Sequence, residues 1–331
     1  MEERIICTII TGDFAHYALA LHDSLASQDS EINFAIFISG GKISEEHLNV
    51  LQKKEKLKIL HFSQLEKFGL AKELNEKYAN SYHDAFRWGM KPVFTNFLLS
   101  VGYEKVIYLD SDLFFFGNYE FLFEELDRCS VLLSPHWRSS NPKLEYSNFV
   151  DNFRDGIYNA GFFGASKGAR KALDWWSQMV LFKCEVSRKD GYYVDQRYLD
   201  ILPVYFRNIK HLEHRGCNVG NWNQTECKRG LNEHGEVLIN EKFPIVFIHF
   251  TNSLLRGVLL GGDKLLMPHL EEYRKSLLKY SRKDIIEEFY SHGQFEKPRS
   301  ERNGHKEVQN KTSITNKIRR RVIGFGKKFM R

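Results

Sequence analysis

Through the first 110 residues, short apolar runs alternate with longer stretches in which apolar positions recur at helical spacing. The apolar runs predict strands at Ile5–Thr11, Asn33–Ser39, Lys58–Phe62 and Lys105–Asp110. The helical spacing predicts helices at Phe14–Ser27, at Ser44–Lys54 with Ser44 as the N-cap, and from Lys91-Pro92 to about Val101. Strands that alternate with helices in this way form βαβ units, so the pattern predicts an α/β fold with a mainly parallel central sheet flanked by helices.

The second half continues the alternation. It predicts strands at Val131–Ser134, Ala160–Ala165, Glu236–Ile239 and Ile245–Phe250. It predicts helices at Lys167–Cys184 and Val194–Leu199, and a long helical region at Pro268–Tyr290. Pro298 and the polar stretch after it mark a linker. We therefore expect a folded body at residues 1–296 and a basic linker and tail at residues 297–331.

The formal net charge of +6 is distributed unevenly along the chain. Residues 299–331 hold 11 Lys/Arg and 2 Asp/Glu, which leaves 37 basic and 40 acidic residues in the rest. Apolar residues of the tail recur at helical spacing, namely Ile314, Ile318, Val322, Phe325 and Phe329. Residues 314–331 thus predict a basic amphipathic helix that binds an anionic membrane surface, and the alternative is a disordered, solubilising end. The nearly neutral body argues against a nucleic-acid partner.

Several classes of protein are excluded by composition and pattern. A chain with 42% hydrophobic and 27% charged residues is typical of a globular protein. No apolar run approaches the roughly 18 residues of a membrane span, and Ile5–Ile10 is too short for the core of a signal peptide. The five cysteines include no Cys-x-x-Cys pair, which argues against a disulfide scaffold or thiolate zinc site and favours a reducing compartment.

The candidate chemistry begins where an apolar strand ends in two carboxylates. Asp110 and Asp112 follow Val106–Leu109 and are separated by one residue, so both side chains point to the same side of extended chain. Oxygen ligands at the carboxyl end of a parallel strand suit Mg²⁺ or Mn²⁺, which could bridge a substrate diphosphate there. The alternative is an ordinary polar loop after a buried strand.

The surrounding motifs resemble the nucleotide-sugar glycosyltransferases of GT-A fold, and in particular glycosyltransferase family 8 and its bacterial relatives. The resemblance covers roughly residues 4 to 255 and rests on five ordered segments. These are Thr8–Thr11 with Tyr17, the stretch from Lys91-Pro92 to Asp112, Tyr158-Asn159-Ala160-Gly161, Asp195-Gln196, and Asn218 with Trp222-Asn223.

This resemblance implies a metal site and a donor. Family enzymes bind a UDP-sugar together with Mn²⁺, so Asp110 would contact ribose and metal, and Asp112 would ligate the metal. The third ligand would be His249, at the end of an apolar strand. A capping or partly buried histidine is the alternative. The family's Gly-x-x-Lys-Pro-Trp pattern after this histidine is missing, and Arg256 is the candidate for the phosphate contact in its place.

The resemblance also implies the rest of the pocket. Lys91, or Arg87 nearby, would pair with the donor diphosphate, and a helix N-terminus at Lys91 would favour phosphate as well. Thr11 and Tyr17 would line the nucleotide pocket, although Tyr17 is equally suited to a core position. The catalytic candidates at the sugar are Asn159, Asp195 and Gln196.

Two of these positions have structural alternatives. Asp195 is also suited to be a helix N-cap. Trp222 is suited either to an acceptor-side wall or to a buried loop anchor.

The expected function is therefore metal-dependent transfer of a sugar, with retention of configuration, to a glycan or glycolipid in surface polysaccharide or lipopolysaccharide assembly. The expected location is cytoplasmic, at the cytoplasmic face of the membrane. The alternative enzyme class is a haloacid-dehalogenase-like phosphohydrolase with Asp110 as nucleophile. That class places Thr two residues after the second Asp, where this chain has Phe114.

Overall fold

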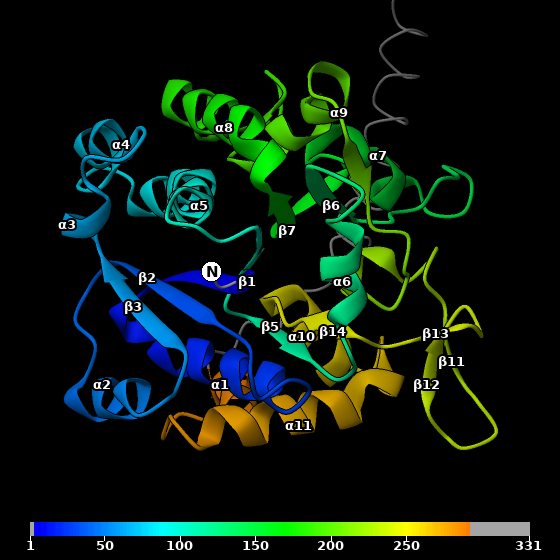
Figure 1. The fold of residues 1–331 in the computed structure, drawn as a ribbon. Helices are drawn as coiled ribbons and strands as arrows, with labels where there is room; N and C mark the ends of the chain where they lie inside the picture. Colours follow the sequence, from blue (N-terminus) through cyan, green and yellow to red (C-terminus); the bar gives the residue numbers. More distant parts are fainter. Residues whose placement is uncertain (1–2, 292–331) are drawn as a thin grey trace, which may run out of the picture. The chain divides into compact units, whose positions relative to one another are not determined.

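A seven-stranded sheet forms the centre of the computed structural model, which describes residues 3–291 (Figure 1). In order across the sheet, the strands are β10 (Ile209–His211), β6 (Val131–Pro135), β7 (Tyr158–Ser166), β4 (Lys105–Leu109), β1 (Arg4–Thr11), β2 (Phe34–Gly40) and β3 (Leu57–His61). Strand β7 runs antiparallel to β4 and β6, whereas the other neighbouring pairs are parallel. The expectation of a mainly parallel sheet is confirmed.

Shorter strands pair outside this sheet. They are β5 (Leu113–Phe115) with β14 (Phe247–His249), β8 (Val186–Ser187) with β9 (Tyr192–Tyr193), and β12 (Val237–Ile239) between β11 (Arg229–Leu231) and β13 (Phe243–Pro244). The strand expected at Ile245–Phe250 therefore forms only in its central part. Its partner β5 follows directly after the acidic pair, which brings two distant parts of the chain together.

Helices cover both faces of the sheet (Figure 1). The helices of this unit are α1 (Ala15–Ala26), α2 (Glu45–Gln52), α3 (Phe62–Leu65), α4 (Ala71–Tyr78), α5 (His83–Ser100), α6 (Glu120–Glu125), α7 (Tyr146–Arg154), α8 (Arg170–Phe182), α9 (Leu202–Tyr205), α10 (Asn252–Leu259) and α11 (Met267–Leu278). A further helix, α12 (Ile285–Ser291), follows α11 in the chain. Short 3-10 helices include η1 (Gly12–Phe14), η3 (Gln196–Ile201) and η4 (Asn221–Asn223). As expected, Ser44 caps α2 by accepting from the backbone N–H of His47 at 3.2 Å.

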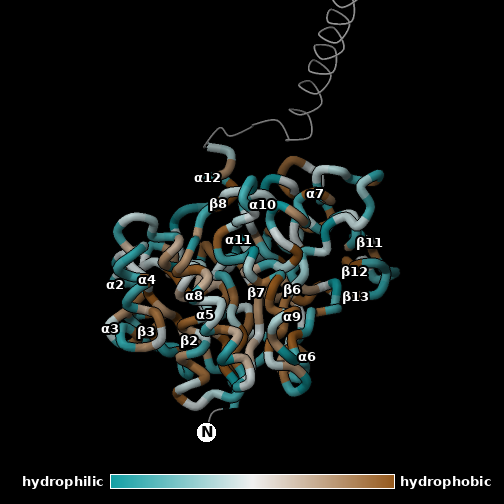
Figure 2. The backbone as a smooth tube through the Cα atoms, turned by 90° about the horizontal axis from the view of Figure 1, so that it is seen from above, coloured by the Kyte–Doolittle hydropathy of each residue, from teal (hydrophilic) through white to brown (hydrophobic). Residues whose placement is uncertain are grey.

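The strand β1 is buried on both faces, which explains its unbroken apolar run. Its residues alternate between two hydrophobic clusters: Ile5 and Ile9 pack with residues of α5 and α8, whereas Ile6 and Ile10 pack with residues of α1. Figure 2 shows hydrophobic residues in the central strands and hydrophilic residues in many outer loops. All five cysteines are free and buried within these layers.

Two expectations need correction, and one helix was not expected. Helix α5 begins at His83, eight residues before Lys91, and Pro92 lies inside it. Buried residues from Ala85 to Leu99 pack this helix against the sheet and α8, and this packing outweighs the backbone hydrogen bond that Pro92 cannot make. The region Pro268–Tyr290 is two helices with a break between Leu278 and Ile285. Helix α7 was not expected at all.

The structure divides at Ile285. Described residues up to Ile285 form one compact unit, and Ile286–Ser291 belong to a second. The boundary expected at 296/297 and the amphipathic tail at 314–331 lie outside the described residues. Within residues 3–291, the structure contains no helix that is long and apolar enough to cross a membrane.

Candidate active site

The acidic pair lies where β4 leaves the sheet. Strand β4 pairs with β7 up to Leu109, and the next backbone N–H, that of Asp110, donates to the carbonyl of Gly161 at 2.7 Å. Asp110 is therefore placed over β7 at the carboxyl end of the sheet's central strands. The chain then turns into β5, and Asp112 lies in this turn.

The histidine reaches the acidic pair through the small sheet of β5 and β14. His249 lies opposite Leu113 in the register, next to Asp112. Its Nε2 lies 3.0 Å from Asp112 Oδ1, and the N–H of Phe250 donates to the Asp112 carbonyl at 2.9 Å. One ligand atom each from Asp110, Asp112 and His249 lies within 4.8 Å of the other two. The three residues expected to bind metal therefore converge.

Two observations show that this cluster fits a divalent cation. His249 Nδ1 is buried and has no hydrogen-bond partner among the described residues. A Cβ at Gly161 would lie 2.5 Å from His249 Cε1 and 3.0 Å from Asp110 Oδ2, so glycine keeps the space between two of the ligands open. Two carboxylates and an imidazole also form a donor set that Mn²⁺ accepts readily.

The charges of the cluster support one another. Burial lowers the pKa of His249, but the Asp112 carboxylate opposes this effect and leaves the pKa raised. Burial likewise raises the pKa of Asp112, but His249 outweighs this effect and the pKa is lowered. The imidazolium of His249 thus offsets the negative charge of Asp112 when no metal ion does.

Lys91 lies in the middle of α5 rather than at a helix N-terminus, so the expected contribution of the helix end to phosphate binding is wrong. Its buried Nζ lies 3.0 Å from Asp110 Oδ1 and 3.5 Å from Asp195 Oδ2. It also donates to the carbonyl of Ala160 at 3.1 Å. Burial lowers the pKa of Lys91, but the two carboxylates raise it more, so the lysine stays charged.

A cavity of about 190 Å³ opens beside these groups. It is lined by five of the predicted site residues, namely Lys91, Asp110, Asn159, Asp195 and Gln196. The lining also includes Trp88, Ala160, Gly161 and Val194, and Val186 and Tyr193 of the hairpin β8–β9. The structure therefore brings five of the predicted residues together around one cavity.

Asp195 turns into this cavity from a strained backbone. The preceding Val194 is β-branched, yet it adopts a φ of 43°, a conformation that such residues rarely adopt. Asp195 occupies the N-cap position of η3, as the structural alternative expects, but its side chain makes no capping hydrogen bond. Burial raises the pKa of its carboxyl, with Lys91 opposing the shift.

Gln196 has a more structural environment than expected. Its Oε1 accepts from the N–H of Ala160 at 3.2 Å, and its Nε2 donates to the carbonyl of Asp155 at 2.8 Å. Both ends of the side-chain amide therefore form hydrogen bonds with backbone groups, and Gln196 links β7 to the loop that follows α7.

Asn159 belongs to a chain of buried polar groups that the sequence did not indicate. Its Nδ2 lies 3.2 Å from His136 Nε2, and its Oδ1 accepts from the N–H of Gly161 at 2.9 Å. His136 Nδ1 faces the carbonyls of Gly156 and Ile157. Burial lowers the pKa of His136 well below its usual value, so a neutral ring accepts from Asn159.

Trp222 is buried, as the loop-anchor alternative requires, and its ring meets those of His136 and His249 edge-on at 5.4 and 5.5 Å. Tyr108 is a second residue that the prediction missed. Its hydroxyl donates to Asp110 Oδ1 at 2.8 Å. The spacing could have indicated Tyr108, because residues 108 and 110 face the same side of an extended chain.

Three predicted residues belong neither to the cavity lining nor to the metal-binding cluster. Thr11 ends β1, and the half-buried Tyr17 lies in α1 with its ring 5.6 Å from that of Phe14. Arg256 lies in α10, and its guanidinium forms no hydrogen bond or ion pair with the described residues. The structure thus leaves these three as surface candidates for the nucleotide.

The chain resembles known proteins in both sequence and fold. The sequence profile described as glycosyl transferase family 8 matches residues 5–253. The Bacillus subtilis (strain 168) protein YfnF is 29% identical over 252 residues, which are 74% of this chain and 80% of that protein. YfnD from the same strain is 30% identical over 200 residues, 59% of this chain and 61% of that protein.

A crystal structure of the galactosyltransferase LgtC with donor and acceptor sugar analogues superimposes with a TM-score of 0.53 at 15% identity. The match covers 85% of this chain and 97% of LgtC. At this identity the likeness establishes the fold.

Proposed function

The chain belongs to glycosyl transferase family 8 and is a glycosyltransferase of GT-A fold, and on that premise we propose that it moves a sugar from a UDP-sugar to a glycan or glycolipid acceptor with Mn²⁺ or Mg²⁺ bound. The observation that carries the proposal is the convergence of Asp110, Asp112 and His249 beside the cavity. A cation held by these three side chains would neutralise charge on the departing diphosphate.

The chain's own residues prepare the site for this chemistry. Lys91 bridges the carboxylates of Asp110 and Asp195 and offsets the repulsion between them. In the proposal, Asp195 stabilises positive charge that develops on the transferred sugar or orients the acceptor hydroxyl. Asn159 contacts the sugar, and Gln196 positions the backbone of β7 and the loop at Asp155.

The proposal places the nucleotide near the end of β1, against Thr11 and Tyr17, with Arg256 contacting phosphate. It extends the retaining course of family members to this chain. The alternative, a phosphohydrolase with Asp110 as nucleophile, has no support. Asp110 Oδ1 accepts from Tyr108 and pairs with Lys91, and Phe114 is buried in β5 where that class requires a threonine.

A thermal-shift panel of nucleotide sugars with and without Mn²⁺ tests this function. We expect one UDP-sugar to raise the melting temperature, and only when metal is present, because a ligand that binds the native state stabilises it. Metal-dependent hydrolysis of the same donor should follow. Equal stabilisation in chelator would overturn the metal role, and stabilisation by no UDP-sugar would overturn the donor.

We also propose that the protein acts at the cytoplasmic face of a membrane, in surface polysaccharide or lipopolysaccharide assembly. This proposal rests on the excess basic charge of residues 299–331. Deleting those residues should weaken binding to anionic vesicles while donor hydrolysis continues. Unchanged vesicle binding by the truncated protein would contradict a role for the tail.

A further inference from the structure

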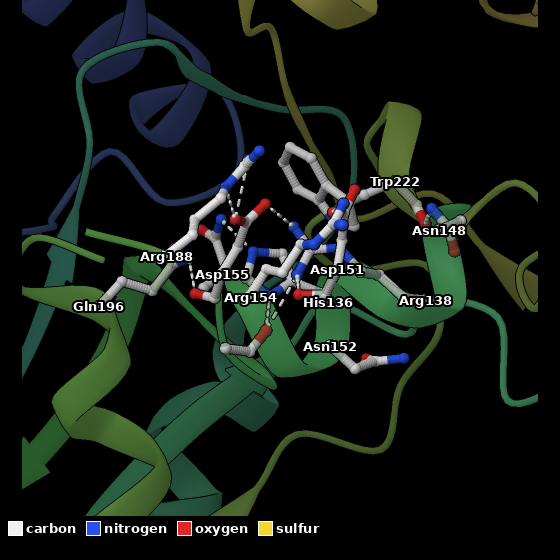
Figure 3. Close-up of polar contacts among 12 residues, drawn as sticks. His136, Arg138, Asn148, Asp151, Asn152, Arg154, Asp155, Arg188, Gln196 and Trp222 are labelled. Atoms are coloured by element: carbon white, nitrogen blue, oxygen red, sulfur yellow. Dashed lines mark hydrogen bonds and ion pairs between the residues drawn. The ribbon is translucent and has the colours of Figure 1, made fainter. Parts of the chain in front are cut away.

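Helix α7 packs on the protein through its polar face. Asn148 accepts from the N–H of Ser139 at 2.6 Å and donates to the carbonyl of Trp222 at 2.9 Å. One turn later, Asn152 donates to the carbonyl of Ser139 at 3.2 Å. Figure 3 shows Asn148 beside Trp222, with Asn152 further along the same helix. Polar side chains at positions i and i+4 therefore attach this helix to the body.

The apolar residues of the same helix lie on its opposite side. A surface helix normally turns its apolar stripe toward the core, but α7 has no buried residue. Tyr146 and Phe153 are 70% and 64% exposed. The outer face of α7, as we call it, consists of Leu144, Tyr146, Phe149, Val150, Phe153 and Ile157.

The chemistry of this outer face favours acyl chains over a glycan. A site that binds sugar needs hydrogen-bonding groups beside aromatic rings. The asparagines of α7 instead form hydrogen bonds with the rest of the protein, and half of the outer face is aliphatic. The residues beside the outer face carry both signs of charge: Lys143 and Arg154 are basic, Glu145 is acidic, and Arg154 pairs with Asp151 at 3.8 Å. A helix face of exposed aromatic and aliphatic residues is typical of helices that lie in the interface of a bilayer, and the preference for anionic lipid comes from the basic residues 299–331.

Helix α7 contacts the candidate active site through its polar side. Asn148 holds the backbone of Trp222, whose ring contacts His249 of the metal-binding cluster. The net charge of the chain favours the same partner, because residues 299–331 add an excess of nine positive charges by sequence. A bilayer at the outer face would therefore lie across helix α7 from the candidate active site.

We propose that the outer face of α7 inserts into the surface of an anionic lipid bilayer, so that an acceptor carried on a lipid reaches the cavity from the membrane side. The acceptor part rests on the proposed function, whereas the insertion does not. The insertion uses residues that are separate from the metal-binding cluster and from the basic tail.

Co-sedimentation of the full chain with phosphatidylcholine vesicles containing phosphatidylglycerol tests the insertion. The test variant is the double substitution Tyr146→Ser/Phe153→Ser. The matched control is Val204→Ser/Tyr205→Ser, which removes an equally exposed apolar pair from α9 (77% and 75% exposed). We expect about tenfold weaker vesicle binding for the α7 variant and wild-type binding for the control.

Vesicle binding at high salt distinguishes the contribution of the outer face from that of the tail, because salt screens charge attraction but not apolar insertion. The difference between the α7 variant and the control should persist there. Equal vesicle binding by both variants would overturn the proposal. Light scattering gives a further decisive outcome: a wild-type dimer that the α7 substitutions dissociate would assign the outer face to a second copy of the chain.

Donor hydrolysis keeps this test independent of the proposed function. We expect both double variants to hydrolyse the UDP-sugar at the wild-type rate, because neither pair lies in the site. Vesicle binding lost with hydrolysis unchanged supports insertion. Hydrolysis absent from every protein, wild type included, would count against the proposed function and leave the insertion result valid.

Discussion

The ammonium group of Lys91 lies 3.0 Å from the carboxylate of Asp110, in the interior of α5 and almost fully buried. The same ammonium lies 3.5 Å from Asp195. One cation therefore compensates two carboxylates, of which one faces the metal-binding cluster and the other the cavity. This arrangement makes Lys91 a part of the site's charge balance rather than a free phosphate ligand.

Replacing Lys91 with methionine should cost both stability and activity. The change leaves the buried Asp195 without its cation, and removing one partner of a buried ion pair typically destabilises a protein by about 3–5 kcal/mol. Urea unfolding should show this loss, and donor hydrolysis should fall below detection. The double variant Lys91→Met/Asp195→Asn should recover part of the stability but no activity. Purely additive losses of stability would contradict the pairing.

Replacing Asp112 with asparagine should abolish metal-dependent activity while the fold persists. The side chain is 36% exposed and makes its ion pair with His249, so little packing is lost. Calorimetric titration should show that the affinity for Mn²⁺ is lowered by about 100-fold or more.

Replacing His249 with alanine should weaken the binding of Mn²⁺ and of UDP together. Unchanged titrations for either variant would remove that residue from the site.

A methyl group at Gly161 should obstruct the site from within. The Cβ of Gly161→Ala would lie too close to His249 and to the side chain of Asn159 (2.5 and 2.8 Å), so both must shift. We expect Mn²⁺ affinity to fall by at least about tenfold, since small displacements of ligands weaken metal sites. Gly230→Ala is the matched control, because nothing lies within 4 Å of its Cβ. Equal titrations for both variants would show that the space at Gly161 is not used.

Much of this fold was predictable because its strands are buried on both faces. Such strands appear as continuous apolar runs, as at Ile5–Thr11, whatever their partners are. Helix α7 was missed because its apolar residues point outward and its polar residues point inward, the reverse of the usual pattern. The start of α5 was missed because Pro92 resembles a helix beginning, and only tertiary packing carries the helix past it.

The site was predictable where local spacing determines the geometry. Asp110 and Asp112 are one residue apart on extended chain, so their convergence follows from the strand alone. The role of His136 depends on Asn159 and on two backbone carbonyls some 20 residues away in the chain. The position of Lys91 depends on how α5 packs against the sheet. Contacts of this kind have no signature in a single sequence.

The hairpin β8–β9 forms one wall of the cavity, and Arg188 attaches this hairpin to Asp155. Arg188 Nε and Nη2 lie 3.2 and 3.0 Å from Asp155 Oδ1, while the buried Arg138 approaches the other carboxylate oxygen at 3.4 Å (Figure 3). Arg188→Gln should loosen this wall and raise the KM several-fold with a smaller change in kcat, which steady-state kinetics would measure. Arg188→Lys should restore part of the KM.

Lys189→Gln is the matched control for the hairpin, since Lys189 is exposed and forms no ion pair with the described residues. Its kinetics should match those of the wild type. A KM for Arg188→Gln no higher than that of the control would show that the ion pair does not shape the cavity.

The stability of the protein should fall in acid partly through Asp23 in α1. One carboxylate oxygen accepts from Lys54 at 2.6 Å and the other from the hydroxyl of Tyr280 at 2.6 Å. Burial raises the pKa of Asp23, but the nearby imidazole of His22 and the hydrogen bonds from Lys54 and Tyr280 outweigh this effect and lower it. A carboxyl with a lowered pKa in the folded state stabilises the protein above its unfolded pKa, near 4, and this contribution is lost as the pH falls further.

Asp23→Asn isolates that contribution, because the amide keeps the shape but not the charge. At neutral pH the variant should unfold more easily than the wild type by about 1–2 kcal/mol. Denaturant titrations at decreasing pH should bring the two proteins together, since protonation removes the charge from the wild type as well. A stability difference that stays constant from neutral pH to below pH ~3 would mean that Asp23 acts through packing rather than through its charge.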